Sequence, residues 1–478
     1  MRASSLKHLK YFLIVVFLIW GSSLYAQKAR IGDVSITGNF KTKDHAIEIR
    51  LPIAKGACFK LSDAEVLKKA AKVNLVNTNL FNDVQVALIC SDSFKHVYTW
   101  QISLIEKWYI WPLPFVEIAD RNINQWQQLD WDPGRTNFGL YLFHYNLFGL
   151  NQTLKLSLIA GYTKNLGIEY LTGRLGKESI YRLGAKLKFR ENYEIPAFTQ
   201  NDMLEFTSNP NGKLLTTREV ELNIQQVLDN RRRHRITASW TSWNLIDEWM
   251  SFLPTDYFNM EHSPFRSNTL NKYSVSSYWE IDHRDNRLYA VSGYRLGVDL
   301  QLNHLQSSEN ETYPEFRFDG DFFKSNNKRL FGYVSMKARK RYIRQLPYLL
   351  SNAFGYGDYV RGYENHVVDG RDFALMKTGL RMKLLGQTLN TPFMPLRKYK
   401  TANTDLYLGL FSDLGFAGNG KTLTNEINSN SFYEELLWGY GLGLEGVFYY
   451  DKVFRFEYSM SRHGDNIFSL YFKQAISN

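Results

Sequence analysis

Val360-Arg361-Gly362-Tyr363 and Phe411-Ser412-Asp413-Leu414-Gly415 are the two stretches around which this chain is organised. The first lies in a long segment rich in glycine and aromatic residues, and the second ends a segment with strand-like alternation. In that segment Leu408 and Leu410 share one face and Asp413 lies on the other, because side chains alternate along a strand. The second stretch therefore predicts a strand with one apolar face and a carboxylate on the opposite face.

The same alternation, with a period of two residues, recurs from residue 108 to the end of the chain. It divides this region into sixteen strand candidates, at 108–120, 135–147, 152–162, 165–174, 179–192, 216–228, 232–244, 271–283, 292–305, 314–325, 329–345, 371–385, 402–415, 435–449, 452–461 and 465–476. Bacterial single-chain outer-membrane barrels have an even number of antiparallel strands. We therefore predict an all-β transmembrane barrel of about 16 antiparallel strands over residues 108–478.

The connections between these candidates alternate between long and short. Long connections fall at 193–215, 246–270, 346–370 and 416–434, and short ones at 148–151, 229–231, 326–328 and 450–451. Outer-membrane barrels have long extracellular loops and short periplasmic turns. The connection at 386–401 departs from the alternation. The sorting of the loops favours a membrane barrel over a secreted, water-soluble all-β protein, which has no reason to sort its loops this way.

The composition fits a barrel better than a helical membrane protein. The chain contains 30 Tyr, 32 Phe and 11 Trp, and its mean hydropathy is -0.35. Barrels escape hydropathy analysis because lipid-facing and lumen-facing residues alternate, and they collect aromatic residues at both membrane interfaces. The formal net charge of +11 favours contact with lipopolysaccharide phosphates or acidic proteins. No basic stretch has base-reading character, so we expect no nucleic-acid partner.

Residues 1–26 have the pattern of a secretory signal peptide. The start is basic, with Arg2 and Lys7, and the apolar run from Tyr11 to Trp20 is too short to span a bilayer as a helix. We expect cleavage after Ala26 and placement in the bacterial outer membrane. The alternative is an N-terminal membrane anchor.

Residues 28–107 are predicted to form a separate module with the order β-α-α-β-β. Its strands and helices are expected at 31–36, 42–51, 62–74, 84–88 and 97–106. Both cysteines, Cys58 and Cys90, fall in this module. Export to an oxidising compartment permits a disulfide between them, although the sequence leaves open whether their Cα atoms lie close enough.

This module resembles a POTRA domain, the periplasmic module of the BamA/TamA-like family of outer-membrane assembly and translocation barrels. The matching stretches are Ile36-Thr37-Gly38-Asn39, Asn79-Leu80-Phe81-Asn82-Asp83-Val84 and Glu106-Lys107-Trp108. In the barrel, Val360–Tyr363 and Phe411–Gly415 resemble the family's inward-folded sixth extracellular loop and the strand motif that receives it. The chain differs from the general assembly factors of the family in having a single POTRA domain.

The resemblance implies a barrel that assists the assembly or insertion of proteins into the outer membrane. A lateral seam between the first strand, 108–120, and the last strand, 465–476, would open to the client. POTRA modules bind extended strands at an exposed sheet edge, so the implied partners are unfolded client barrel proteins or exported proteins, with accessory assembly subunits and outer-membrane lipid. Polypeptide export of the two-partner-secretion type is the main alternative, and a passive porin is a third possibility. It also stays open whether the module at 28–107 is only a spacer that binds no client.

The resemblance also implies that Arg361 and Asp413 form a charge pair inside the barrel. Arginine suits this place because its planar fork grips a carboxylate with two hydrogen bonds. Around the pair, Val360 and Gly415 complete the two motifs, Gly362 allows a tight turn, and Tyr363 or Phe411 is expected to pack on the guanidinium. Glu445, on the inward face of the next strand, is expected as a second partner of Arg361.

An enzymatic function is not expected. The chain has no Gly-x-Ser-x-Gly motif, its ten His residues form no recognised metal-ligand spacing, and two cysteines in a POTRA-like module do not make a zinc site. We therefore predict no catalytic residues, no metal and no cofactor.

Overall fold

The computed structural model describes residues 28–474, except 122, 174, 176–179, 210–211, 229–230, 254–256, 259–266, 288, 327–328, 344–345, 391–400, 419–430 and 449–451. The predicted signal peptide and its cleavage after Ala26 lie outside the described residues. The chain divides into two compact units, with the boundary between Lys107 and Trp108. No helix among the described residues is long and apolar enough to cross a bilayer.

The N-terminal unit is a four-stranded sheet with two helices. Its elements are β1 (Lys28–Thr37), α2 (Asp44–Glu48), β2 (Cys58–Lys60), α3 (Ala64–Val76), β3 (Phe81–Asp92) and β4 (Val97–Glu106), and the sheet order is β2-β1-β4-β3. The two central strands, β1 and β4, are parallel, and the outer pairings are antiparallel. Fully buried side chains from both layers form the core, among them Ile31, Ile47, Leu75, Trp100 and Ile102. The short edge strand β2 is the one element that the predicted order lacks.

The disulfide that the sequence left open is not formed. Cys58 and Cys90 are both exposed free thiols. Cys58 lies on β2 and Cys90 on β3, the two opposite edges of the sheet, with β1 and β4 between them. Three strand spacings separate these edges by about 14 Å, twice the Cα separation that a disulfide tolerates.

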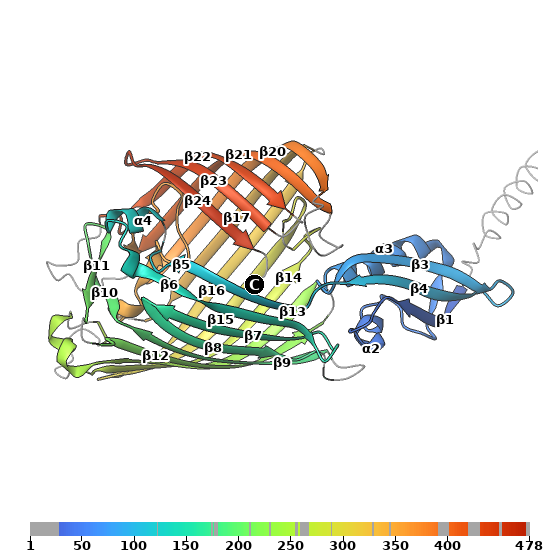
Figure 1. The fold of residues 1–478 in the computed structure, drawn as a ribbon, viewed down its shortest axis with the longest axis horizontal. Helices are drawn as coiled ribbons and strands as arrows, with labels where there is room; N and C mark the ends of the chain where they lie inside the picture. Colours follow the sequence, from blue (N-terminus) through green and yellow to red (C-terminus); the bar gives the residue numbers. More distant parts are fainter. Residues whose placement is uncertain are drawn as a thin grey trace, which may run out of the picture. The chain divides into compact units, whose positions relative to one another are not determined.

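The second unit is a sixteen-stranded antiparallel barrel sheet, as predicted (Figure 1). Its strands are β5 (Ile110–Ile118), β6 (Thr136–Leu147), β7 (Gln152–Gly161), β8 (Thr163–Leu171), β9 (Tyr181–Asn192), β12 (Leu215–Val227), β13 (Arg232–Leu245), β14 (Thr269–Asp282), β15 (Gly293–Gln306), β16 (Asn310–Ser325), β17 (Leu330–Arg341), β20 (Asp372–Asn390), β21 (Thr401–Gly418), β22 (Leu436–Phe448), β23 (Lys452–Ser461) and β24 (Asn466–Gln474). Neighbours in the sheet follow chain order, and β5 and β24 are its two ends. Among the described residues no backbone ladder joins these two ends.

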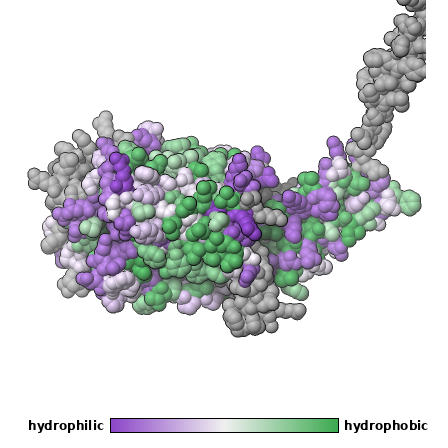
Figure 2. All heavy atoms as spheres, turned by 90° about the horizontal axis from the view of Figure 1, so that it is seen from above, coloured by the Kyte–Doolittle hydropathy of each residue, from purple (hydrophilic) through white to green (hydrophobic). Residues whose placement is uncertain are grey.

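The two faces of the sheet are those that the alternation predicts. On β21 and β22, Leu408, Leu410, Trp438 and Leu442 are exposed on the outer surface, whereas Asp413 is fully buried. Figure 2 shows an apolar band across the middle of the barrel surface, between more hydrophilic regions toward its ends. Such a band is the surface that a bilayer covers in outer-membrane barrels.

The connection at 386–401 is shorter than predicted because both flanking strands are long. β20 has 19 residues and β21 has 18, and the connection between them, 391–400, lies outside the described residues. A register shift between Lys383 and Leu385 interrupts the pairing of β20 with β21. This bulge places both Leu384 and Leu385 on the exposed side, which breaks the period of two and hides the rest of the strand from sequence reasoning.

The long loops carry small elements that the alternation did not predict. These are α4 (Ile123–Gln128), the hairpin β10 (Glu194–Gln200) with β11 (Met203–Ser208), η3 (Asp247–Phe252), η4 (Tyr348–Leu350), β18 (Asn352–Phe354) and β19 (Val368–Asp369). Loop and strand residues meet in an apolar cluster that includes Ile195, Leu214, Tyr257, Leu305 and Tyr348. The loops therefore share an apolar core with the ends of the wall strands.

Candidate functional site: the loop held in the barrel lumen

The connection between β17 and β20 contains the Val360–Tyr363 stretch and folds against the inner wall of the barrel. Val360 is 1% exposed, Arg361 3% and Tyr363 2%. Val360 and Tyr363 belong to an apolar cluster with Phe354, Ala417 and Leu437, and the last two of these lie on wall strands β21 and β22. A predicted extracellular loop is thus largely removed from solvent.

Arg361 grips Asp413 with a bidentate ion pair. Its Nη2 donates to Asp413 Oδ1 at 2.6 Å and its Nε donates to Asp413 Oδ2 at 2.8 Å. The backbone N–H of Arg361 also donates to Oδ2, at 3.2 Å. Burial lowers the pKa of an arginine, but the hydrogen bond to Asp413 and the nearby negative groups hold the pKa of Arg361 above its ordinary value. The guanidinium is a fixed positive charge at this position.

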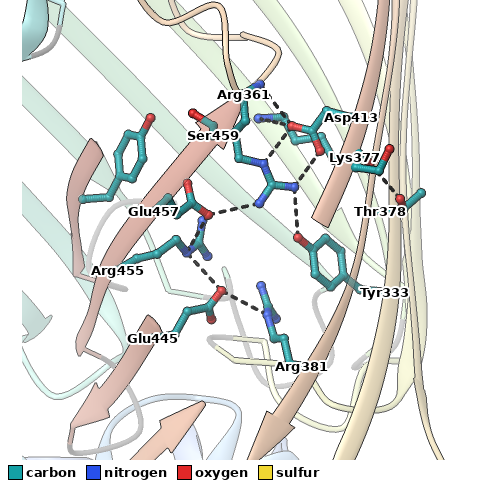
Figure 3. A network of polar contacts seen from close by, with 12 residues as sticks. Tyr333, Arg361, Lys377, Thr378, Arg381, Asp413, Glu445, Arg455, Glu457 and Ser459 are labelled. Atoms are coloured by element: carbon teal, nitrogen blue, oxygen red, sulfur yellow. Dashed lines mark hydrogen bonds and ion pairs between the residues drawn. The ribbon is translucent and has the colours of Figure 1, made fainter. Parts of the chain in front are cut away.

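The second carboxylate on Arg361 is Glu457, and the prediction of Glu445 is wrong. Arg361 Nη1 donates to Glu457 Oε1 at 3.0 Å (Figure 3). Glu445 lies opposite Tyr407 on β21, six positions (413 − 407) from Asp413, which is about 20 Å along a strand. It is therefore buried one step away, with Arg381 Nε and Arg455 Nε each at 3.1 Å from its Oε1.

Two further wall residues complete the shell around Arg361. The hydroxyl of Tyr333 on β17 accepts a hydrogen bond from Nη2 at 3.1 Å. The ring of Phe411 lies under the guanidinium, 3.7 Å from Cζ to the ring centroid. Of the two aromatic residues expected against the guanidinium, Phe411 occupies that place. Tyr363 instead contacts Phe432 and donates to or accepts from His463 Nδ1 at 2.8 Å.

Glycines on the wall make the room that the loop occupies. A Cβ on Gly439 would lie 1.6 Å from the backbone oxygen of Arg361, and a Cβ on Gly415 would lie 2.3 Å from Val360 Cγ2. Gly362 has a φ of +92°, a conformation that favours glycine, and a Cβ there would lie 2.8 Å from the backbone oxygen of Met460. Backbone of the loop and backbone of the wall therefore approach more closely than any side chain would allow.

Glu364 ties the same loop to the last strand. Its Oε2 accepts from the Gly362 N–H at 2.7 Å, and its Oε1 accepts from the hydroxyl of Tyr471 on β24 at 3.3 Å. Burial raises the pKa of Glu364 to about 6. Sequence reasoning did not single out this residue, because a lone glutamate after the motif has no distinctive spacing.

Arg121 is a second arginine that holds this loop, and sequence reasoning did not find it. It comes from the β5–β6 connection, and its Nη1 donates to the backbone oxygens of Gly355 at 2.6 Å and His366 at 3.2 Å. Its Nε donates to Gln125 Oε1 at 2.8 Å. Burial lowers the pKa of Arg121. The α4 segment that follows Arg121 contacts β24, so this connection lies next to both ends of the sheet.

The charged residues of the site hold the loop in place through buried ion pairs. Positive and negative side chains alternate in a buried network. The positive members are Arg361, Lys377, Arg381 and Arg455, and the negative members are Asp413, Glu445 and Glu457. The Lys377 Nζ lies 3.8 Å from Asp413 Oδ2. Among the described residues, no group of three or more His, Cys, Asp or Glu side chains is placed to hold a metal ion. The arrangement fixes a loop in the lumen.

An α+β module followed by a sixteen-stranded antiparallel barrel with an inward-folded loop defines a class of outer-membrane-type barrel proteins. Residues 146–446, more than half of the chain, match the family model of the Omp85 superfamily domain. Residues 29–99 match the POTRA family model described as surface antigen variable number repeat. The chain belongs to the Omp85 superfamily.

Solved structures share the fold at low sequence identity. The crystal structure of BamA from Haemophilus ducreyi lacking POTRA domains 1–3 matches with a TM-score of 0.54 at 11% identity, over 93% of this chain and 84% of that chain. CdiB from Escherichia coli matches with a TM-score of 0.56 at 12% identity, over 93% and 75%. CdiB from Acinetobacter baumannii matches with a TM-score of 0.54 at 12% identity, over 93% and 74%. No curated protein sequence matches this chain.

Proposed function

We propose that this protein assists the insertion of β-barrel proteins into the bacterial outer membrane, through the seam between β5 and β24. The barrel lies in the outer membrane and the POTRA unit in the periplasm. The observation that carries the proposal is the absence of a backbone ladder between β5 and β24 within the described residues. Unpaired strand edges template the addition of another strand, and in a bilayer no water satisfies them.

The loop held in the lumen supports insertion over passive diffusion. The loop carrying Val360–Tyr363 occupies the inner wall and is fixed there by a buried network of ion pairs. A pore for small solutes needs an open lumen. The same loop and network give no reason for an enzymatic role.

The POTRA unit supplies a place for an extended client chain. Its sheet ends on one side in the three-residue β2 and on the other in the twelve-residue β3. A client strand adds to the edge of β3 by main-chain hydrogen bonds, as in other strand-addition complexes. Lipid, lipopolysaccharide, client proteins and accessory assembly subunits are the partners of this proposal.

Depletion of the protein, followed by quantitative proteomics of outer-membrane fractions, tests the proposal. We expect many β-barrel proteins to fall together. Loss of one secreted protein, with the barrel proteins unchanged, would establish export of the kind performed by two-partner-secretion transporters. An unchanged proteome, together with a channel conductance unaffected by deletion of residues 350–366, would establish a porin.

Immobilising the seam provides a second test. After replacement of Cys58 and Cys90 by serine, a cysteine is placed in Ile110–Ile118 and another in Asn466–Gln474, and the pair is joined by a bifunctional reagent. We expect the crosslinked protein to fail in a complementation assay that the uncrosslinked double-cysteine variant passes. Full activity after crosslinking would rule out a lateral route.

A further inference from the structure

The two edges of the seam differ in the hydrogen bonds that they are able to make. Ala119 N donates to Arg135 O at 2.8 Å just beyond one end of β5, and Tyr145 N donates to Tyr109 O at 2.8 Å just before the other. The register of β5 with β6 has no shift between these points. The odd-numbered residues of β5 therefore face β6, and the N–H and C=O groups of its even-numbered residues point to the seam.

Two of the five even-numbered residues of β5 are prolines. Pro112 and Pro114 have no N–H, so the seam edge of β5 keeps donors only at Ile110, Val116 and Ile118. The donors at Ile110 and Val116 are six residues, or about 20 Å, apart. A strand laid against this edge would leave carbonyl groups without donors in a medium that contains no water. Within sheets, proline is found mainly on edge strands, at the first residue of a strand and at bulges.

The edge of β24 has no such gap. Ser461 N donates to Asp465 O at 2.9 Å, and the register of β23 with β24 continues without a shift, so the odd-numbered residues of β24 face β23. The N–H and C=O groups of Asn466, Phe468, Leu470, Phe472 and Gln474 point to the seam. All five residues carry a donor and an acceptor.

We propose that the seam is a one-sided docking edge, in which an extended strand of a client β-barrel protein adds to β24 and the two prolines bar β5 from serving as its template. This inference rests on the proposed function and deepens it, because it names the edge that receives the client. A strand paired with β24 along its whole length satisfies both backbones. The same strand paired with β5 does not.

The side chains of β24 define the kind of strand that fits. Phe468 and Leu470 are exposed toward lipid, whereas Ile467 and Ser469 are buried on the inner face. A strand beside β24 therefore has to present apolar residues to the lipid and small or polar residues to the lumen, with a period of two. This is the pattern of a transmembrane β-strand. Because α4 contacts β24, the client strand shares this edge with α4 (Figure 1).

Site-specific photocrosslinking in cells tests the proposal on the full chain. A photoreactive amino acid replaces Leu470 on β24 in one strain and Val116 on β5 in another, since both residues are exposed to lipid. Mass spectrometry identifies the crosslinked protein and the strand that carries the crosslink. We expect adducts with strands of outer-membrane β-barrel proteins to be at least tenfold more abundant at Leu470 than at Val116. Equal or greater yields at Val116 overturn the proposal.

Restoring the donors separates the role of the prolines from other differences between the strands. In the Pro112→Ala/Pro114→Ala double variant we expect client adducts at Val116 to rise several-fold. Pro314→Ala is the matched control, because Pro314 lies on β16 with its backbone directed to Tyr342 rather than to the seam. No rise at Val116 in the double variant overturns the role of the prolines.

Other occupants of the edge give distinct products. An adduct of Leu470 with β5 of the same chain, at the yield expected for a client, shows a closed seam and overturns the proposal. An adduct of twice the chain mass shows pairing between two copies and overturns it as well. If neither position yields client adducts while depletion still removes barrel proteins, the docking edge is wrong and the proposed function stands. If depletion also has no effect, both fail.

Discussion

Arg361 and Arg121 hold the same loop, and the partners of the two arginines differ in charge. Arg361 belongs to the loop and reaches carboxylates on the barrel wall, Asp413 and Glu457. Arg121 belongs to another connection and reaches backbone carbonyl oxygens of the loop, on Gly355 and His366. The pKa of Arg361 is raised by its charged partners, whereas burial lowers the pKa of Arg121. The first contact locks the tip of the loop to the wall, and the second fixes the shape of its flanks.

The largest effect is expected from breaking the charged contact. Arg361→Ala leaves two buried carboxylates without their main partner, so we expect it to lower the free energy of unfolding by about 3–5 kcal/mol. Asp413→Ala should cost a similar amount, and the double variant should be little worse than either. Urea unfolding of the barrel in lipid vesicles measures all three.

Lys155→Ala is the control for that experiment. Lys155 pairs with Glu169 on the neighbouring strand at 3.0 Å, but the pair is partly exposed, so its loss should cost about 0–1 kcal/mol. Additive losses for Arg361→Ala and Asp413→Ala would show that the two residues act independently.

The neutral contact should matter less. Arg121→Ala removes charge-assisted hydrogen bonds to loop carbonyl groups, and we expect it to cost about 1.5–3 kcal/mol and to speed proteolysis within residues 346–370. Arg121→Lys keeps the charge but loses the fork, so it should restore less than half of the protection. A loop that stays as protected in Arg121→Ala as in the wild type would show that Arg121 does not hold it.

A glycine substitution displaces the loop while leaving every charged partner in place. Gly439→Ala brings a methyl group against the backbone oxygen of Arg361, and we expect a cost of about 1–3 kcal/mol from overpacking. Gly409→Ala is the matched control on the neighbouring strand, because its Cβ would have its nearest neighbour at 3.7 Å. Equal unfolding free energies for the two variants would contradict the close approach at Gly439.

The smallest effect expected is a change in pH dependence. The pKa of Glu364 is raised to about 6 in the folded chain from the usual 4.5, so the folded state holds a proton that the unfolded state releases first. The contribution of Glu364 to stability is therefore fully present below about pH 4.5 and is lost as the pH rises through 6. Glu364→Gln should remove this loss, with a gain of up to about 2 kcal/mol at pH 8 that vanishes near pH 4. An equal gain at both pH values would show that Glu364 does not titrate in this way.

The strands and their faces could be predicted because a membrane barrel imposes a period of two on every strand. This period placed Asp413 and Glu445 on the inner face. It did not reveal that Glu457 would reach Arg361, because the vertical offset between strands depends on the register of the sheet. The contacts of Arg121 were also hidden, since backbone carbonyl oxygens are present at every position and leave no mark in a sequence. The bulge on β20 misled the prediction because it interrupts the period of two itself.

The sequence separation of the charged contact has a consequence for the order of folding. Asp413 follows Arg361 by 52 residues and Glu457 follows it by 96, in the last strands of the barrel. Contacts of such separation form late, because the chain between them has to be ordered first. The Arg361 contacts are therefore expected among the last to form, and their formation marks the completion of the wall. A chain that stops before β23 has Arg361 but lacks Glu457, so it cannot form the second ion pair. The full set of Arg361 contacts is therefore reached only when the last strands have been added.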